Sequence, residues 1–582
     1  MRKSFKSAGF TFINTLLFIS VITIVGYLGY RNRSILSQII GRNRITETAS
    51  TYNLKELKNK LTPEIRECII SKLGKTEALR LLQETKDAKS IPTKAREVLR
   101  ICLPESVKNV PPPSEPQNYP VLPGFPALQK LDTSNLIAYQ IWLNYYAQNP
   151  ENGSNSDNVF INAASHLSEL ADMGITMIQL SPFHPFLKQT TIGSPYGSLD
   201  FYDVNPGYAT GDKSARIQSL KEYIDQAHSK NIKVIMDCVY HSTDPKNVLI
   251  TSHPEYYQRN FLGQISKNRY GFAVLDFNNP ETRNYMINMV KYWEQTVGID
   301  GCRADVAIYI PLSFWAMLNN EIKKIKPEWF MVAETSTKLQ EYGATYSGPG
   351  YHLQETYQNV YGFDAVYGVD SMIVLRKIIN NNAFADNLQK AWLYPEQEKI
   401  PASAGTIFYR AIDNHDQRPR AVSLAGGNPG MIASMVINFT LDGIPFIFNG
   451  QEIGDTAQTS IPIQRYISWN NPPQPENKSI IRQLINLRKA HPALKMGSTV
   501  WHTTSNPNQI ISYVRQYGNE KILVSVNMSP SQWTGSTISP PGQTLIGTAT
   551  NLLTGQTTST QPINNTLSLS LGPYGYLIAQ IE

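Results

Sequence analysis

The chain has few cysteines and no metal-binding cysteine pattern. Its 582 residues include only four, and none forms a CxxC pair: Cys68, Cys102, Cys238 and Cys302. This spacing excludes a small disulfide-rich scaffold and a thiolate zinc site. We expect Cys238 and Cys302 to be buried thiols, whereas Cys68 and Cys102 could pair if the chain is exported.

Charged residues are also scarce, at 17%, against 41% hydrophobic residues, a composition typical of a globular protein. The net charge of +7 is unevenly distributed, because residues 1–110 carry 20 Lys/Arg and 9 Asp/Glu while residues 111–582 carry 33 and 37. The large C-terminal part therefore has no basic stripe, which argues against nucleic acid as a partner. A chain of this length predicts two to four domains.

One long apolar run is present near the N-terminus. Residues 7–30 contain no charged side chain, and this run is long enough to span a bilayer. No A-x-A-like cleavage site follows the run, so we expect a single-pass membrane anchor at residues 10–30, although a cleaved signal peptide stays open. Basic residues flank both ends, so the positive-inside rule leaves the orientation nearly undecided.

The next segments connect this anchor to the rest of the chain. Residues 31–108 show apolar residues at helical spacing, for example Leu54, Leu57 and Leu61, and predict a helical stalk. Residues 109–130 are rich in proline and predict a stiff linker and a domain boundary.

From residue 131 the sequence alternates short apolar strands with amphipathic helices. Eight strands are predicted, at 136–143, 177–180, 233–239, 301–306, 330–334, 366–369, 407–412 and 445–448, with helices at 163–173, 217–229, 283–297, 314–325 and 479–494. Eight such units predict an α/β fold, a (β/α)8 TIM barrel over residues 131–494, with an inserted subdomain at 242–280 after the third strand. Residues 495–582 are rich in Ser, Thr, Asn and Gln and predict a C-terminal antiparallel β-sandwich.

Carboxylates follow several of these strands. The sequence GIDGCRADV at 298–306 places Arg303 and Asp305 on one face of a strand, where the guanidinium would keep the carboxylate ionised. Asp237, Glu334 and Asp416 end or follow other strands. The C-terminal ends of barrel strands are where a (β/α)8 enzyme carries its catalytic groups, so we expect these side chains to converge.

Ordered blocks along residues 136–578 resemble the α-amylase superfamily of retaining glycoside hydrolases. The blocks are GITMIQLSP at 174–182, MDCVYH at 236–241, VLDFN at 274–278, GCRAD at 301–305, VAE at 332–334, NHD at 414–416 and GIPFIFNGQE at 443–452. The resemblance implies that the substrate is an α-glucan or a maltooligosaccharide.

The same resemblance implies a role for each matched residue. Asp305 would be the nucleophile that forms a glycosyl-enzyme intermediate, with Arg303 orienting it, and Glu334 would be the general acid/base. Asp416 would bind the sugar hydroxyls beside His415. In the retaining scheme the pKa of the acid must rise while that of the nucleophile stays low.

Three further residues complete the substrate site that the resemblance implies. Asp237 would support the site from the third strand, and Tyr196 would stack on the sugar. The family has Asn-His after the third strand, where this chain has His241-Ser242. His241 replaces the sugar-binding histidine only if one residue is missing, and the family's calcium-binding Asn has no match in a gapless alignment. We therefore expect no cofactor, with Ca²⁺ left open.

The N-terminal sequence KSAGFTFI at 6–13 resembles a type IV prepilin leader. That resemblance implies cleavage after Gly9 by a prepilin peptidase, a leader at residues 1–9 and a barrel outside the cytoplasm. The family has Glu at the fifth mature position, where this chain has Asn14.

Three functions remain open at the level of sequence. The first is a membrane-anchored glycosidase that hydrolyses α-glucosidic bonds. The second is a transglycosylase of the same family, which passes the glucosyl unit to a sugar hydroxyl. The third is a non-catalytic glucan-binding head on a pilin-like stem, against which the complete set Asp305, Glu334 and Asp416 argues.

Overall fold

The computed structural model describes residues 68, 70–73, 131–146, 158–187, 194–260, 262–334, 362–393, 407–457, 467, 469–540, 548–559 and 565–581. The predicted leader, the anchor at 10–30, nearly all of the stalk and the linker at 109–130 lie outside these residues. Within the described residues, no helix is both long and apolar enough to cross a membrane. Cys68 is disulfide-bonded, whereas Cys238 and Cys302 are buried free thiols, as expected.

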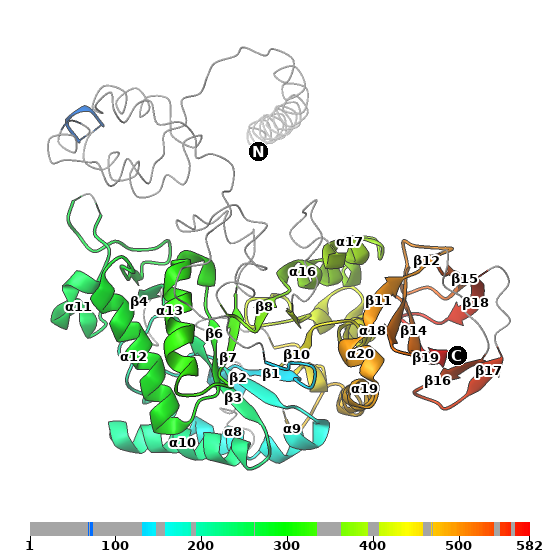
Figure 1. The fold of residues 1–582 in the computed structure, drawn as a ribbon, viewed down its shortest axis with the longest axis horizontal. Helices are drawn as coiled ribbons and strands as arrows, with labels where there is room; N and C mark the ends of the chain where they lie inside the picture. Colours follow the sequence, from blue (N-terminus) through cyan, green and yellow to red (C-terminus); the bar gives the residue numbers. More distant parts are fainter. Residues whose placement is uncertain are drawn as a thin grey trace, which may run out of the picture. The chain divides into compact units, whose positions relative to one another are not determined.

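Eight parallel strands close into a barrel in the order β1-β10-β9-β8-β7-β6-β3-β2 (Figure 1). All eight predicted strands are confirmed. Their bounds are β1 Ala138–Ile141, β2 Met177–Leu180, β3 Lys233–Cys238, β6 Gly301–Ala304, β7 Phe330–Ala333, β8 Ala365–Tyr367, β9 Phe408–Arg410 and β10 Ile444–Phe448.

Helices pack around this barrel, and local sequence sets their ends. In α12 (Pro280–Val297) the side chain of Asn279 accepts a hydrogen bond from the backbone N–H of Glu281, and Gly298 ends the helix with a φ of 81°. Among the described residues, the other helices of four or more residues around the barrel are α7 Leu143–Tyr146, α8 Val159–Ala164, α9 Leu167–Met173, α10 Lys213–His228, α13 Leu312–Lys323, α16 Val369–Ile379, α17 Asn387–Leu393, α18 Gly427–Thr440, α19 Asn477–Ala490 and α20 Pro492–Met496.

The single helix predicted at 163–173 is wrong, because the chain breaks there between α8 and α9. The N–H of His166 bonds to the carbonyl of Ala163, three residues back, and the hydroxyl of Ser165 donates to the carbonyl of Asn162. Side-chain hydrogen bonds of this kind compete with the regular helical ladder.

Between β3 and α12 the chain forms only short elements. They are β4 Ser242–Thr243, α11 Leu249–Ser252, the 3-10 helix η3 Pro254–Tyr256 and β5 Ala273–Val274, with β4 and β5 paired antiparallel.

The C-terminal residues form antiparallel sheets, as expected. A six-stranded sheet has the order β11-β13-β14-β19-β16-β17, and a three-stranded sheet has the order β12-β15-β18. The strands are β11 Ser498–Trp501, β12 Thr503–Thr504, β13 Ile510–Tyr517, β14 Glu520–Asn527, β15 Trp533–Ile538, β16 Thr548–Asn551, β17 Thr557–Ser559, β18 Thr566–Leu571 and β19 Tyr576–Ile581.

Buried arginines lie where this domain meets the barrel. Arg515 of β13 donates to the backbone carbonyls of Ala493 and Leu494 in α20. Arg488 of α19 donates to the backbone carbonyls of Phe439, Leu441, Leu494 and Gly443. Since each of these carbonyls is otherwise a buried acceptor near a helix or strand end, the guanidinium satisfies several of them at once.

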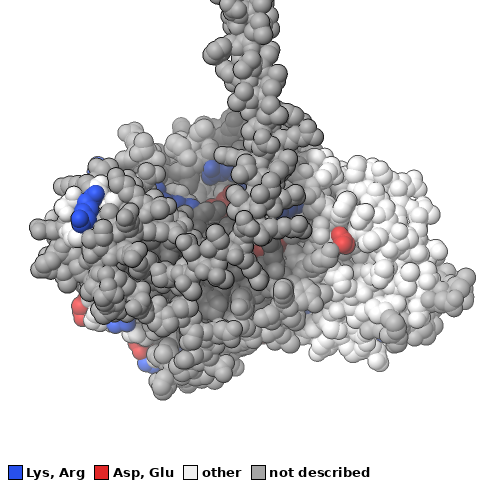
Figure 2. All heavy atoms as spheres, turned by 90° about the horizontal axis from the view of Figure 1, so that it is seen from above, with Lys and Arg blue, Asp and Glu red and all other residues white. Residues whose placement is uncertain are grey.

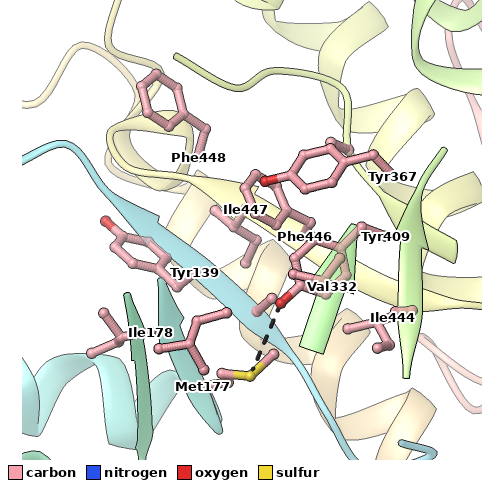
Figure 3. Packing of buried hydrophobic residues seen from close by; sticks show 14 of the residues in the cluster. Tyr139, Met177, Ile178, Val332, Tyr367, Tyr409, Ile444, Phe446, Ile447 and Phe448 are labelled. Atoms are coloured by element: carbon pink, nitrogen blue, oxygen red, sulfur yellow. Dashed lines mark hydrogen bonds between the residues drawn. The ribbon is translucent and has the colours of Figure 1, made fainter. Parts of the chain in front are cut away.

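Aromatic and aliphatic side chains fill the barrel wall and interior (Figure 3). Tyr409 lies next to Phe446, with ring centroids 5.3 Å apart, and its hydroxyl contacts the sulfur of Met177 at 4.0 Å. All three residues are buried. A filled barrel of this kind has no pore, so its chemistry must lie at an end of the strands.

Gly301, at the start of β6, has no room for a side chain. A Cβ there would lie 2.3 Å from the carbonyl oxygen of Phe330 and 2.8 Å from Cγ2 of Ile235. We therefore expect Gly301→Ala to lower the free energy of unfolding by about 1–3 kcal/mol, because both neighbouring strands must shift.

Thermal unfolding measures this effect. Gly572→Ala is the matched control, because nothing lies within 4 Å of its Cβ position, and we expect a change of no more than about 0.5 kcal/mol there. Equal melting temperatures for the two variants would contradict this packing of β6.

Candidate active site

Arg303 joins two carboxylates at the C-terminal end of β6. β3 and β6 pair in parallel with Asp237 opposite Arg303. Nη1 of Arg303 donates to Oδ1 of Asp237 at 2.8 Å and to Oδ1 of Asp305 at 2.7 Å. The Arg303 side chain is fully buried. The predicted shared face of Arg303 and Asp305 is confirmed.

Glu334 reaches the same guanidinium from β7. Its Oε2 lies 2.8 Å from Nη2 of Arg303 and accepts the backbone N–H of Val306 at 2.8 Å. Val306 has a φ of 36°, which is rare for a β-branched residue. The chain thus turns sharply directly after Asp305, and Glu334 holds that turn in place.

His415 lies next to two aromatic rings. Its ring is stacked on Trp142 with centroids 4.9 Å apart and on Tyr196 with centroids 5.4 Å apart. Nε2 of His415 lies 2.7 Å from the Tyr196 hydroxyl, which donates to Oδ2 of Asp237 at 2.7 Å. Tyr196 therefore links the Asp237–Arg303 pair to His415.

Asp416 follows on the same loop, with Oδ2 3.5 Å from Nε2 of His415. Its side chain is 55% exposed, in contrast to the 14% and 12% of Asp305 and Glu334. An exposed carboxylate beside two nearly buried ones is accessible to a ligand that enters from solvent.

Asp413 is fully buried and holds the loop at 414–420, which carries His415 and Asp416. Its carboxylate accepts from the guanidinium of Arg376, from the backbone N–H of Ala421 at 3.0 and 2.9 Å, and from the amide of Gln451 at 3.3 Å. Charge-assisted bonds of this kind are stronger than neutral ones. They hold both ends of the loop that carries His415 and Asp416.

The electrostatics of the site correct one prediction. We expected the pKa of Asp305 to stay low, but burial raises it well above its usual 3.8, and Glu334 and Asp237 act in the same direction. Arg303 opposes this rise without overcoming it. Burial likewise raises the pKa of Asp237. The physical reason is that one guanidinium is shared by Asp237, Asp305 and Glu334 in a site with little solvent.

The ring of His241 packs against that of Tyr309, with centroids 4.7 Å apart. Burial lowers the pKa of His241 from 6.5 to about 4. No group of three or more His, Cys, Asp or Glu side chains that could hold a metal ion occurs among the described residues.

Sequence reasoning missed Gln140, Trp142 and Tyr367. The Nε2 of Gln140 lies 2.9 Å from Nδ1 of His415, and the guanidinium carbon of Arg303 lies 5.5 Å from the Tyr367 ring centroid. A polar residue inside the apolar strand β1 was a usable signal for Gln140. Tyr367 and Trp142 carried no such signal, because aromatic residues are common in strands.

The arrangement therefore belongs to a barrel enzyme with carboxylates at the C-terminal ends of its strands. Figure 2 shows one face of the molecule, on which acidic and basic side chains lie within a hollow. Asp305 and Glu334 are nearly buried against one guanidinium, and Asp416 beside them is exposed. Such a set of carboxylates can supply a general acid and a nucleophile to a bond that is being broken.

Comparison with known proteins identifies the family. The model of the alpha amylase catalytic domain matches residues 161–262 and 250–536, and the model of the maltogenic amylase C-terminal domain matches residues 502–578. The chain belongs to the α-amylase family of glycoside hydrolases.

Individual relatives are distant. A cyclomaltodextrinase of Geobacillus thermopakistaniensis is 26% identical over 446 residues, which cover 72% of this chain and 69% of the relative. A cyclomaltodextrin glucanotransferase of a Bacillus species is 25% identical over 467 residues, covering 71% of this chain and 60% of the relative. A maltogenic alpha-amylase of Thermotoga neapolitana has a structure with a TM-score of 0.65 at 25% identity, covering 77% of this chain and 99% of that one.

Proposed function

We propose that this chain is a retaining glycoside hydrolase that cleaves α-glucosidic bonds in starch-like glucans, maltooligosaccharides or cyclic maltodextrins. The observation that carries the proposal is the binding of Asp305 and Glu334 to the two terminal nitrogens of one guanidinium, at 2.7 and 2.8 Å. Because both carboxyl groups contact the same guanidinium, they lie close to each other. This closeness is compatible with retaining enzymes, in which the two carboxyl groups are roughly 5–5.5 Å apart.

The proposed reaction has two steps. Asp305 attacks the anomeric carbon, while Glu334 in its protonated form gives its proton to the leaving glycosidic oxygen. Glu334 then takes a proton from water, whose oxygen displaces Asp305 from the anomeric carbon. Asp416 and His415 bind hydroxyls of the same sugar, and Tyr196 lies beside His415 as an aromatic surface.

The nucleophile must be ionised for the first step. Because burial raises the pKa of Asp305, activity should rise with pH as this carboxyl loses its proton. A sugar that fills the site and binds Glu334 would remove one of the carboxylates that compete for Arg303, and this favours ionised Asp305.

Transfer to a sugar hydroxyl is the second candidate, and the cyclomaltodextrin glucanotransferase relative favours it. The two reactions share the first step and differ only in the acceptor. Product chains separate them, because transfer yields maltooligosaccharides longer than the substrate.

The direct test incubates the full chain with maltoheptaose, β-cyclodextrin and soluble starch and follows the products by chromatography. We expect shorter maltooligosaccharides from maltoheptaose and linear products from the cyclic substrate. Longer chains from maltoheptaose would establish transfer instead. Binding of glucan with no product from any substrate would overturn the enzyme proposal in favour of a binding head.

We also propose that the barrel is tethered to a membrane. The charge-free run at residues 7–30 supports this proposal, and the prepilin-like sequence before it supports an extracytoplasmic barrel. Alkaline extraction of membranes tests it: the full chain should stay with the membrane, and release into the soluble fraction would contradict an anchor.

A further inference from the structure

Gln140 is a buried amide in the middle of an apolar strand. It lies on β1, opposite Gln179 of β2 and Phe448 of β10, and is completely inaccessible to solvent. Its Nε2 lies 2.9 Å from Nδ1 of His415, which stands after β9. A buried amide is unfavourable unless its hydrogen bonds are made, so this contact calls for an explanation.

Counting donors assigns the proton on the His415 ring. When Asp237 is ionised, the Tyr196 hydroxyl gives its one hydrogen to Oδ2 of that carboxylate. The 2.7 Å contact of Tyr196 with Nε2 of His415 therefore requires the hydrogen on Nε2. An amide Nε2 carries only donors, so Nδ1 of His415 must be an acceptor facing Gln140.

Stacking alone does not choose between the two ring nitrogens. The rings of Trp142 and Tyr196 lie nearly parallel to the imidazole, at interplanar angles of 11° and 17°. A ring turned over within that plane would stack equally well. The hydrogen bonds at its edges decide which nitrogen faces the Tyr196 hydroxyl and Asp416.

We propose that Gln140 is a positioning residue that holds His415 neutral, with its proton on Nε2 and aimed at Tyr196, Asp416 and a sugar hydroxyl between them. The inference rests on the proposed function for its substrate, but the assignment of the proton does not. Oε1 of Gln140 makes no hydrogen bond to any of the described residues, so among these residues the amide is held through its Nε2 donor.

The surrounding charges agree with a neutral ring. Burial lowers the pKa of His415 from 6.5 to about 4, with Arg303 and Arg418 acting in the same direction and Asp237 and Glu334 against it. Asp416 also lies 3.5 Å from Nε2. The amide donor of Gln140 that faces Nδ1 adds to this preference, because protonation of Nδ1 would place two donors face to face.

Gln140→Glu tests the proposal by exchanging the donor for a carboxylate of nearly the same shape. The carboxylate accepts a hydrogen from Nδ1, so we expect His415 to become an imidazolium near neutral pH. The acidic limb of the pH profile of kcat/KM should move by about one unit or more, and kcat/KM at pH 7 should fall about 10- to 100-fold, as when an outer partner that orients a histidine is lost.

The control is Gln179→Glu, which adds the same charge at the paired position of the next strand. The Oε1 of Gln179 accepts from the hydroxyl of Tyr367, and His415 is not its partner. We expect the Gln179→Glu variant to keep the pH profile of the wild type. Thermal unfolding of both variants identifies any general loss of folding.

Nitrogen NMR of full chains labelled in histidine reads the proton directly, with His415→Asn used to assign the signal. The wild type should show a neutral ring protonated on Nε2, and Gln140→Glu should show both nitrogens protonated. A wild-type ring protonated on Nδ1, or an unchanged ring in Gln140→Glu, would overturn the proposal. A chain that cleaves no glucan but shows the expected spectra refutes the proposed function and leaves the role of Gln140 intact.

Discussion

Replacing Asp305 by Asn should lower kcat on maltoheptaose by about a million-fold, the scale on which loss of the nucleophile acts in a covalent hydrolase. The amide keeps the size of the side chain and can still contact Arg303, but it cannot form the ester with the anomeric carbon. Initial rates of reducing-end release measure the effect.

Two controls separate this result from misfolding. Asp225→Asn changes an exposed carboxylate of α10 that pairs with Lys221 at 2.6 Å, and its activity should equal that of the wild type. The Asp305→Asn chain should also keep its melting temperature and its affinity for maltoheptaose. Residual activity within about tenfold of the wild type would exclude Asp305 as the nucleophile.

Replacing Arg303 by Met should destabilise the fold by about 3–5 kcal/mol, because it leaves buried carboxylates without their cation. Asp237 and Asp305 both bond to Nη1, and Glu334 lies 2.8 Å from Nη2. Activity should be lost as well, since the carboxyl of Asp305 would then ionise only at a higher pH.

The sign of the pH dependence follows from the pKa shifts. Burial already raises the pKa values of Asp237 and Asp305, so the folded state binds more protons than the unfolded state above about pH 4. The contribution of these carboxyls to stability is therefore fully present below that pH and is lost as pH rises through the folded pKa values. Without Arg303 these pKa values rise further, and the loss of stability relative to the wild type should be larger at pH 8 than at pH 5.

Arg488→Met is the matched control for Arg303→Met. Arg488 is also fully buried, but its hydrogen-bond acceptors are backbone carbonyls. Burial lowers its pKa from 12.5 to about 9, so it stays charged between pH 5 and 8, and its loss should destabilise the fold equally at both. Chemical denaturation at the two pH values makes the comparison. A pH-independent effect of Arg303→Met would show that its carboxylates are not coupled to it.

The strands and the pair Arg303 and Asp305 were predictable because each depends on a pattern of neighbouring residues in the sequence. Apolar runs such as β2 and β10 predict buried parallel strands, and Arg303 and Asp305 share a face through the two-residue period of a strand alone. The order of the family blocks then placed Asp237, Glu334 and Asp416 in one site.

The remaining contacts depend on how the barrel closes. Gln140 contacts His415 because closure of the barrel brings β1 and β9 together on either side of β10. No local sequence pattern near either residue predicts that arrangement. The pKa of Asp305 was predicted in the wrong direction, because the pairing with Arg303 is local whereas burial and the carboxylates of Asp237 and Glu334 come from other strands.

The proposed mechanism requires that Asp305 carries the sugar between the two steps. A maltosyl fluoride with fluorine on the sugar ring, which slows the second step more than the first, should leave a glycosyl ester on the chain, and peptide mass spectrometry should locate it at Asp305. This label should be absent from Asp305→Asn. Products of inverted configuration with no ester, or an ester on another residue, would contradict this mechanism.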